Sequence, residues 1–224
     1  MGKLIIIESR TDGAGKETQT KALYERLTNE GYNVKRITFP NYGTPGCKPV
    51  EAYLNGDLGD TPSAINPYAI SSMYANDRFF SYAQDWGKFY EEGGIIISDR
   101  YTTSNMIHQG AKISDKNEKD AYLEWLYDLE FNKYNLPKPD CVIFLDVPLE
   151  YSKQLMLNRA NKINGSEKKD IHESDMNYLE NCSNSSDYIA TKFNWNKINC
   201  IEDNKMRTIE DIHNDIYNEV VSLL

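Results

Sequence analysis

The sequence has no long hydrophobic run, no excess of positive charge and no recognisable export signal. Its longest apolar runs, "LIII" and "CVIFL", have the length of a strand and are too short to cross a bilayer. Acidic residues outnumber basic ones by 34 to 25, for a formal charge of −9, whereas nucleic acids and anionic membranes are bound by basic surfaces. The start, Met1-Gly2-Lys3 and four apolar residues, does not match a signal peptide. We therefore expect a cytoplasmic protein that binds neither membranes nor nucleic acid.

Cysteine and histidine are scarce and scattered. The four cysteines (Cys47, Cys141, Cys182 and Cys200) form no C-x-x-C pair, and the three histidines form no cluster in the sequence. This spacing excludes the common zinc motifs and gives no sign of a disulfide framework, so we expect free thiols. The negative net charge does not exclude a small phosphorylated ligand, because a pocket can be locally basic inside an acidic protein.

The pattern that is present is typical of a parallel α/β fold. The chain has 224 residues, 40% of them hydrophobic, which predicts a single domain over residues 1–224 with a substantial core. Short apolar runs alternate with segments of helical period, which favours a parallel sheet flanked by helices. The expected strands are 3–7, 33–39, 95–98, 141–148 and 196–201. The first expected helix begins at Lys16. Further helices are expected near 50–54, over 67–91, within 103–134, over 149–161 and before the strand 196–201, and Thr208 is expected to cap the last helix.

The segment "DGAGKET" lies where a phosphate-binding loop is expected, between the first strand and the first helix. Backbone N–H groups of such a loop and the positive end of the helix dipole face phosphate groups. The loop residues are Asp12, Gly13, Ala14 and Gly15, and the ammonium of Lys16 would neutralise phosphate oxygens. The sequence therefore predicts a nucleotide site, and the alternative is a tight turn that is merely rich in glycine.

Two residues depart from the usual pattern G-x-x-x-x-G-K-[ST]. Arg10 takes the place of the first glycine, and Glu17 takes the place of the hydroxyl residue, with Thr18 one position later. We expect the side chain of Arg10 to strain or widen the turn and weaken ATP binding. The alternatives are that the turn tolerates Arg10, or that Arg10 adds a cation to the site. Losing the hydroxyl would leave Mg²⁺ dependent on water, phosphate oxygens and acidic residues such as Asp12 and Asp99.

Further candidate residues follow the third strand and lie on the long helix. Asp99 and Arg100 fall at the carboxyl edge of the sheet, where a carboxylate can organise magnesium and an arginine can bind phosphate. The alternative is a strand-capping Asp in a surface salt bridge. Tyr74 and Arg78 are four residues apart on one helix face and suit a planar base, although a packed Tyr beside a surface Arg would show the same spacing. Side chains that could reach base edges, or could only cap a helix, are Ser104, Asn105, His108 and Gln109.

Taken together, the motifs resemble a known family. "DGAGKETQ", "FPNYG" (39–43), "YANDR" (74–78), "DRYTTSN" (99–105) and "LDVP" (145–148) occur in the order and at roughly the spacing of thymidylate kinases, over about residues 3–220. The resemblance implies a P-loop kinase fold, a three-layer α/β/α sandwich with a five-stranded parallel sheet. It also implies transfer of the γ-phosphoryl group of ATP to dTMP, a requirement for Mg²⁺, and a homodimer.

The resemblance also assigns roles to residues. It implies a catalytic set of Asp12, Lys16, Asp99 and Arg100, with Asp12 and Asp99 near the metal. It implies an ATP site of Asp12, Gly13, Ala14, Gly15, Lys16, Glu17, Thr18 and Arg159. It implies a dTMP site of Phe39, Tyr42, Tyr74, Arg78, Arg100, Ser104, Asn105 and His108. His108 stands where many members have a Tyr beside the deoxyribose, which leaves the selectivity for the sugar open.

A polar segment over about residues 159–176 corresponds to the lid of the family. Its cations are Arg159, Lys162, Lys168 and Lys169, and Asp170 and Glu173 resemble acidic residues near the metal, although any one of these side chains could belong to a solvated turn. Two other functions stay open. One is another nucleoside or nucleotide kinase on the same fold. The other is a nucleotide-binding protein that has lost catalysis, for which Arg10 is the chief support.

Overall fold

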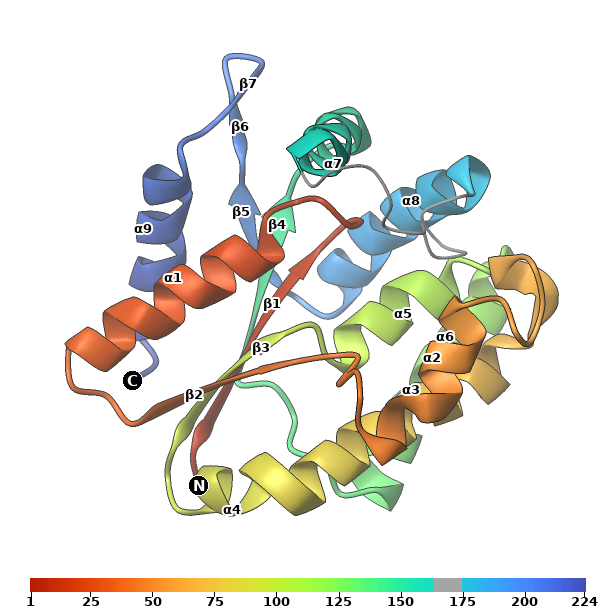
Figure 1. Cartoon of the computed structure of the whole chain (residues 1–224), viewed down its shortest axis with the longest axis horizontal. Helices are drawn as coiled ribbons and strands as arrows, with labels where there is room; N and C mark the ends of the chain where they lie inside the picture. The colour runs from red at the N-terminus through yellow and green to blue at the C-terminus, as the bar shows by residue number, and fades with distance from the viewer. Residues whose placement is uncertain (163–174) are drawn as a thin grey trace.

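The computed structural model describes the backbone of residues 1–162 and 175–224, and the side chains outside residues 156–174. At its centre is a parallel five-stranded sheet with the strand order β2-β3-β1-β4-β5 (Figure 1). The strands are β1 (Lys3–Ser9), β2 (Val34–Thr38), β3 (Ile95–Asp99), β4 (Cys141–Asp146) and β5 (Asn196–Asn199). The predicted fold class is confirmed, and all five expected strands belong to this sheet.

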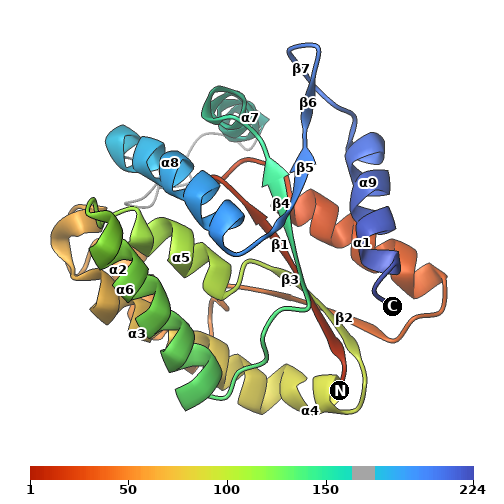
Figure 2. The same cartoon turned by 180° about the vertical axis from the view of Figure 1, so that it is seen from behind.

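Helices connect the strands and cover both faces of the sheet (Figures 1 and 2). They are α1 (Lys16–Asn29), α2 (Lys48–Leu54), α3 (Pro67–Ser81), α4 (Gly87–Glu91), α5 (Thr102–Gly110), α6 (Lys116–Tyr127), α7 (Leu149–Lys162), α8 (Met176–Lys192) and α9 (Ile209–Val221). Short 3₁₀ turns cover Pro45–Cys47 and Pro62–Ala64, and π-helical turns cover Tyr82–Trp86 and Asp128–Lys133. The helix expected over 67–91 is therefore α3, a π turn and α4 in succession.

The side chains of the central strand β1 show that the sheet is buried on both faces. Ile5 and Ile7 pack in a core cluster with residues of α1 and α9, whereas Leu4 and Ile6 pack on the opposite face with Trp86 and other aromatic residues. Alternate side chains thus meet different helices, and a continuous apolar run is what a strand covered on both faces requires. The carboxyl end of β1 consequently opens at the sheet edge where ligands bind in such folds.

The end of the chain contains one expected and one unexpected element. Thr208 is the N-cap of α9, and its Oγ1 accepts a hydrogen bond of 3.1 Å from the backbone N–H of Asp211, as predicted. A small antiparallel hairpin, β6 (Ile201–Glu202) and β7 (Lys205–Met206), precedes this cap and was not anticipated. All four cysteines are buried free thiols. Of the helices in the described ranges, none is long and apolar enough to cross a membrane.

Candidate active site

A pocket of about 730 Å³ lies at the carboxyl edge of the sheet. It brings together every predicted site residue whose side chain the structure describes. On the loop side these are Asp12, Gly13, Ala14, Gly15, Lys16, Glu17 and Thr18; on the opposite side they are Phe39, Tyr42, Tyr74, Arg78, Asp99, Arg100, Ser104, Asn105 and His108. The side chain of Arg159 lies outside the described residues, as do the lid residues 163–174.

The phosphate loop has the backbone conformation that anion binding needs. Gly13 and Gly15 have φ of 79° and 84°, in the left-handed region that glycine adopts without strain. Gly15 is the N-cap of α1, so the N–H groups of the first helical turn have no acceptor within the helix. The Nζ atom of Lys16 donates to Ser9 Oγ at 2.8 Å and lies 3.5 Å from Asp12 Oδ1. Backbone dipole and lysine charge together make this end of the pocket attractive to phosphate.

Arg10 does not show the strained backbone that the sequence led us to expect. It is not among the described residues with a positive φ, so a side chain fits where glycine is usual. Its guanidinium points away from the loop, and its Nε donates to Asp146 Oδ1 at 2.7 Å. Its Nη2 donates to Asp187 Oδ1 at 2.8 Å. Arg10 is thus neither an obstacle in the pocket nor an added cation for phosphate.

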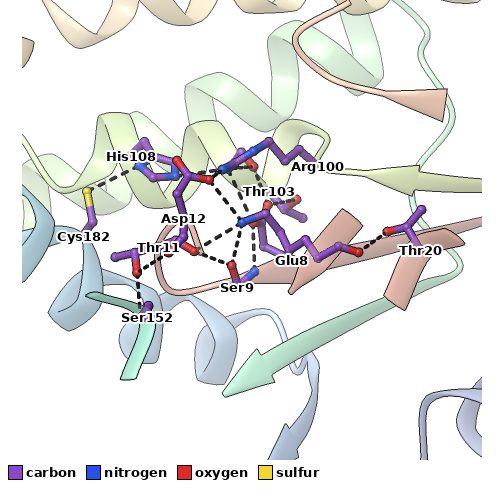
Figure 3. A network of polar contacts seen from close by, with 12 residues as sticks. Glu8, Ser9, Thr11, Asp12, Thr20, Arg100, Thr103, His108, Ser152 and Cys182 are labelled. Atoms are coloured by element: carbon purple, nitrogen blue, oxygen red, sulfur yellow. Dashed lines mark hydrogen bonds and ion pairs between the residues drawn. The ribbon is translucent and has the colours of Figure 1, made fainter. Parts of the chain in front are cut away.

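Arg100 follows β3 and extends its guanidinium toward Asp12 of the phosphate loop and His108 of α5 (Figure 3). Its φ of 68° is a conformation that costs a non-glycine residue about 1–3 kcal/mol and that clusters at functional sites. Its guanidinium forms an ion pair with Asp12 and donates to Ser104 Oγ at 3.2 Å. Burial opposes its charge, but the nearby carboxylates, first Asp12 and then Glu8, outweigh burial and raise the pKa of Arg100. Arg100 is therefore a permanent, oriented cation.

Glu8 is a buried part of the site that the sequence interpretation passed over. Its carboxylate accepts hydrogen bonds from Thr103 Oγ1 at 2.9 Å and Ser104 Oγ at 2.5 Å, and it lies 4.0 Å from Arg100 (Figure 3). These contacts tie the end of β1 to the start of α5. A charged residue at the end of an otherwise apolar strand was the available signal, because a buried carboxylate needs partners.

Asp99 is a carboxylate in an unfavourable environment for its charge. Burial raises its pKa above the ordinary value, and the positive charges of Lys16 and Arg100 offset this rise only in part. The negative charges of Glu8 and Asp12 raise the pKa further. Among the described residues, none donates a hydrogen bond to the Asp99 carboxylate. Its oxygens are therefore available to a ligand in the pocket.

We expect Asp99→Asn to make the folded protein more stable at neutral pH. The pKa of Asp99 is higher in the folded protein than in the unfolded chain. The contribution of its carboxyl group to stability is therefore complete below the unfolded-state pKa and is lost as the pH rises through the folded-state pKa. The asparagine does not suffer that loss, so the difference should appear near pH 7 and shrink toward about pH 4. Thermal unfolding at both pH values measures it. The exposed Asp128, whose pKa is lowered, serves as the control, since Asp128→Asn should not stabilise. A less stable Asp99→Asn protein at pH 7 would contradict the account.

The far side of the pocket contains a buried ion pair. Arg78 is 1% exposed, and its Nε and Nη2 donate to the two carboxylate oxygens of Glu130 at 2.6 Å each. Thr102 Oγ1 donates to the same carboxylate at 2.7 Å. Glu130 thereby fixes the plane of a guanidinium that lines the pocket on the same side as Tyr74. No local pattern in the sequence pointed to Glu130, which lies in a π-helical turn 52 residues after Arg78.

His108 connects the pocket to α8. Its Nε2 lies 3.3 Å from Arg100 Nη1 and its Nδ1 lies 3.5 Å from Cys182 Sγ (Figure 3). Its backbone carbonyl accepts a hydrogen bond of 2.8 Å from Tyr178 Oη. Burial raises the pKa of the Cys182 thiol to about 12, so this cysteine is a neutral packing partner rather than a nucleophile.

The pocket extends beyond the phosphate loop to a surface that the sequence did not reveal. Met206, Arg207, Ile209 and Ile212, from the β6–β7 hairpin and α9, line this end. Gln19 of α1 donates to the carbonyl of Ile209 at 3.0 Å and so joins the surface to the loop helix. Its apolar side chains beside an arginine suit a planar ring.

The acidic residues of the pocket fit a magnesium ion that is held mainly by phosphates and water. Mg²⁺ prefers oxygen ligands and commonly takes only one or two carboxylates from the protein. Asp12 and Asp99 supply such oxygens, and in the described part of the chain no group of three or more His, Cys, Asp or Glu forms a metal cage. This donor set suits a metal that arrives with a nucleotide.

Comparison with known proteins gives one consistent family. The family model described as thymidylate kinase matches residues 11–216. The chain is 32% identical over 224 residues to the probable thymidylate kinase of Thermococcus kodakarensis, an alignment that covers 99% of this chain and 98% of that protein. It is 32% identical over 162 residues to the thymidylate kinase of Mycobacterium tuberculosis, covering 71% and 72%. The thymidylate kinase of Candida albicans shares the fold, with a TM-score of 0.70 at 21% identity over 99% of this chain and 92% of that chain.

Proposed function

This chain belongs to the thymidylate kinase family, and we propose that its pocket transfers the γ-phosphoryl group of ATP to dTMP, giving ADP and dTDP for the synthesis of dTTP. The protein is an ATP-dependent phosphotransferase. The observation that carries the proposal is the position of Arg100. This cation lies in one continuous pocket with the phosphate loop, against Asp12, and with the aromatic side chain of Tyr74.

We assign the phosphate loop to ATP and the opposite side of the pocket to dTMP. Lys16 and the N–H groups at the start of α1 would bind the β- and γ-phosphates, and the donor base would lie against the β7–α9 surface around Arg207. Tyr74 would stack on thymine, with Phe39 and Tyr42 around the acceptor nucleotide and Ser104 and Asn105 near its base and sugar. Nη1 of Arg78 is not engaged by Glu130 and makes one long contact, 3.5 Å to the carbonyl of Tyr101. Its other hydrogen would donate to a thymine carbonyl.

The transfer itself needs positioning and neutralisation of charge rather than a covalent intermediate. An oxygen of the dTMP phosphate attacks the γ-phosphorus, a new P–O bond forms, and the bond to ADP breaks. Two anions must approach each other, so cations placed where charge develops lower the barrier. Lys16 acts on the donor side and Arg100 on the acceptor phosphate. Asp12 holds Arg100 in place, and no general base is assigned.

The family relationship supports further parts of the proposal. Mg²⁺, held by phosphates and water with Asp12 and Asp99, would neutralise phosphate charge and orient the oxygens. We propose that the whole chain is one P-loop kinase domain, that residues 159–176 form its lid, and that Arg159 contributes a cation to ATP. We further propose that it acts as a cytoplasmic homodimer.

The alternative of a nucleotide-binding protein without catalysis is not favoured. Its chief support was Arg10, and the side chain of Arg10 turns away from the phosphate loop toward Asp146 and Asp187. Another nucleoside kinase on the same fold is not favoured either, because the relatives reported above are named as thymidylate kinases or probable thymidylate kinases.

The test is the release of ADP by the purified protein with ATP, Mg²⁺ and one acceptor at a time. We expect kcat/KM for dTMP to exceed that for dCMP and dAMP by roughly 100-fold or more, because a site that hydrogen-bonds one base edge leaves its polar groups unpaired with another. Thymidine without a phosphate should give no signal, since Arg100 would lack its partner. Equal rates with all acceptors, or none with dTMP, would overturn the proposal.

A further inference from the structure

Arg10 links the phosphate loop to a helix that also contacts the opposite side of the pocket. We propose that Arg10 is a positioning residue for the reaction: its guanidinium fixes α8 against the loop, so that the donor and acceptor halves of the pocket keep one geometry. Among the described residues, Arg10 is absent from the pocket lining, so it would act through other residues rather than on a nucleotide. The inference rests on the proposed function.

The guanidinium of Arg10 is enclosed by partners from β4 and α8. Its Nη2 lies 2.6 Å from Asp146 Oδ1 at the end of β4, and Asp187 of α8 accepts from both Nη1 and Nη2. Nη1 also approaches the carbonyl of Ser183 at 3.4 Å, and the ring of Phe144 lies 5.9 Å away. A planar fork held by two carboxylates fixes orientation as well as distance, which a single surface ion pair does not.

The cluster is balanced in charge, and Arg10 is its sheltered member, whereas Asp187 and Lys197 are 47% and 39% exposed. The Arg10 side chain is 13% exposed, and a second cation, Lys197 of β5, lies 3.0 Å from Asp187 and 3.5 Å from Asp146. Burial opposes the ionised form of Asp187, but the hydrogen bonds from Arg10 and Lys197 outweigh it and lower the pKa. Two cations and two carboxylates thus form a network, which resists rearrangement better than an isolated exposed pair.

The same helix reaches the acceptor side through His108. About one turn before Asp187, Cys182 contacts His108 Nδ1, and Tyr178 donates to the carbonyl of His108. His108 in turn lies 3.3 Å from Arg100 Nη1. A shift of α8 would therefore move the wall of the acceptor pocket and the surroundings of Arg100. A misplacement of about 1 Å can cost up to 100-fold in rate, so a distant contact of this kind can matter for catalysis.

If Arg10 only weakened ATP binding, replacing it with the usual glycine would improve nucleotide affinity. The inference predicts a loss instead. Arg10→Gly should accelerate amide hydrogen exchange in α8 around residues 183–187 by about tenfold, while exchange in α9 stays unchanged. It should also raise KM for both ATP and dTMP by about tenfold, although Arg10 touches neither. Arg10→Lys should recover part of both effects, because an ammonium keeps the charge but not the planar fork. The double variant Arg10→Gly/Asp187→Asn should be no worse than Arg10→Gly alone.

Lys3→Met is the matched control. Lys3 joins the other end of β1 to Asp140, 3.2 Å away and just before β4, and it does not line the pocket. This variant should leave exchange in α8 and both KM values unchanged.

Normal exchange in α8 and normal KM values in Arg10→Gly, or additive losses in the double variant, would overturn the inference. If Arg10→Gly does not fold, Arg10→Lys and Asp187→Asn provide the same comparison. If the parent protein does not phosphorylate dTMP, the proposed function fails, whereas the exchange measurement still decides whether Arg10 fixes α8.

Discussion

Replacing Lys16 with alanine should lower kcat/KM for dTMP phosphorylation by about 10³-fold. A preorganised hydrogen-bond donor aimed at developing charge contributes roughly 10²–10³-fold to the rate. Lys16 brings a full positive charge to the transferred phosphoryl group, so we expect an effect at the upper end of this range. Lys16 is 6% exposed and is held within the loop by Ser9 and Thr11, so its ammonium is oriented before any nucleotide binds. A coupled ADP-release assay with ATP and dTMP varied separately measures the loss.

The loss should fall mainly on kcat and on KM for ATP. KM for dTMP should change by less than about threefold, because the acceptor phosphate is assigned to Arg100. Lys21→Ala is the matched control, since Lys21 lies on the same helix but is 63% exposed and, within the described part of the chain, pairs with Glu25 alone. Retention of more than about a tenth of the activity in Lys16→Ala would show that the loop is not the phosphoryl donor site.

Glu130→Leu should lower the free energy of unfolding by about 3–5 kcal/mol. It leaves the guanidinium of Arg78 fully buried without its counter-ion and removes the acceptor of Thr102, and breaking a buried pair from one side costs this much. Urea denaturation of the parent and the variant measures the change. Glu92→Gln, at the exposed pair with Lys88, should change stability by less than about 0.5 kcal/mol and serves as the control.

A double variant separates stability from recognition. Arg78→Met/Glu130→Leu replaces the buried pair with apolar side chains, which is often neutral for stability, so most of the loss should be recovered. Recognition of the base should not return, because the variant lacks Arg78, the donor that we assign to a thymine carbonyl. We expect kcat/KM for dTMP to stay about 100-fold below the parent. Parental kcat/KM in the double variant would show that Arg78 does not recognise the base.

Local signals in the sequence predicted the sheet and much of the pocket. The apolar runs marked the three inner strands, β1, β3 and β4, because both faces of the sheet are buried there. The edge strands β2 and β5 are only partly buried and carry charged residues, so their signal was weaker. The loop from Asp12 to Lys16 was recognisable because glycines between a strand and a helix serve phosphate binding. Asp99 and Arg100 followed from their place at the carboxyl edge of β3, and Thr208 from its capping chemistry.

The missed features depend on contacts between residues far apart in the chain. Arg10 pairs with Asp187, 177 residues later, and no local pattern distinguishes this arrangement from a blocked loop. Glu130 becomes the partner of Arg78 only when the π-helical turn after α6 packs beside α3. The β6–β7 hairpin has strands of two residues each, too short for an alternating pattern, and its turn residues Asp203 and Asn204 were its only local signal.

The central claim is that one pocket carries phosphate directly from ATP to dTMP. The most direct test supplies ATP labelled in its γ-phosphate, with dTMP and Mg²⁺, and separates the products after a short incubation. We predict that the label appears in dTDP in equal amount to the ADP formed, and that neither product appears with Lys16→Ala over the same time. Label found only in inorganic phosphate, or ADP formed without labelled dTDP, would contradict the account.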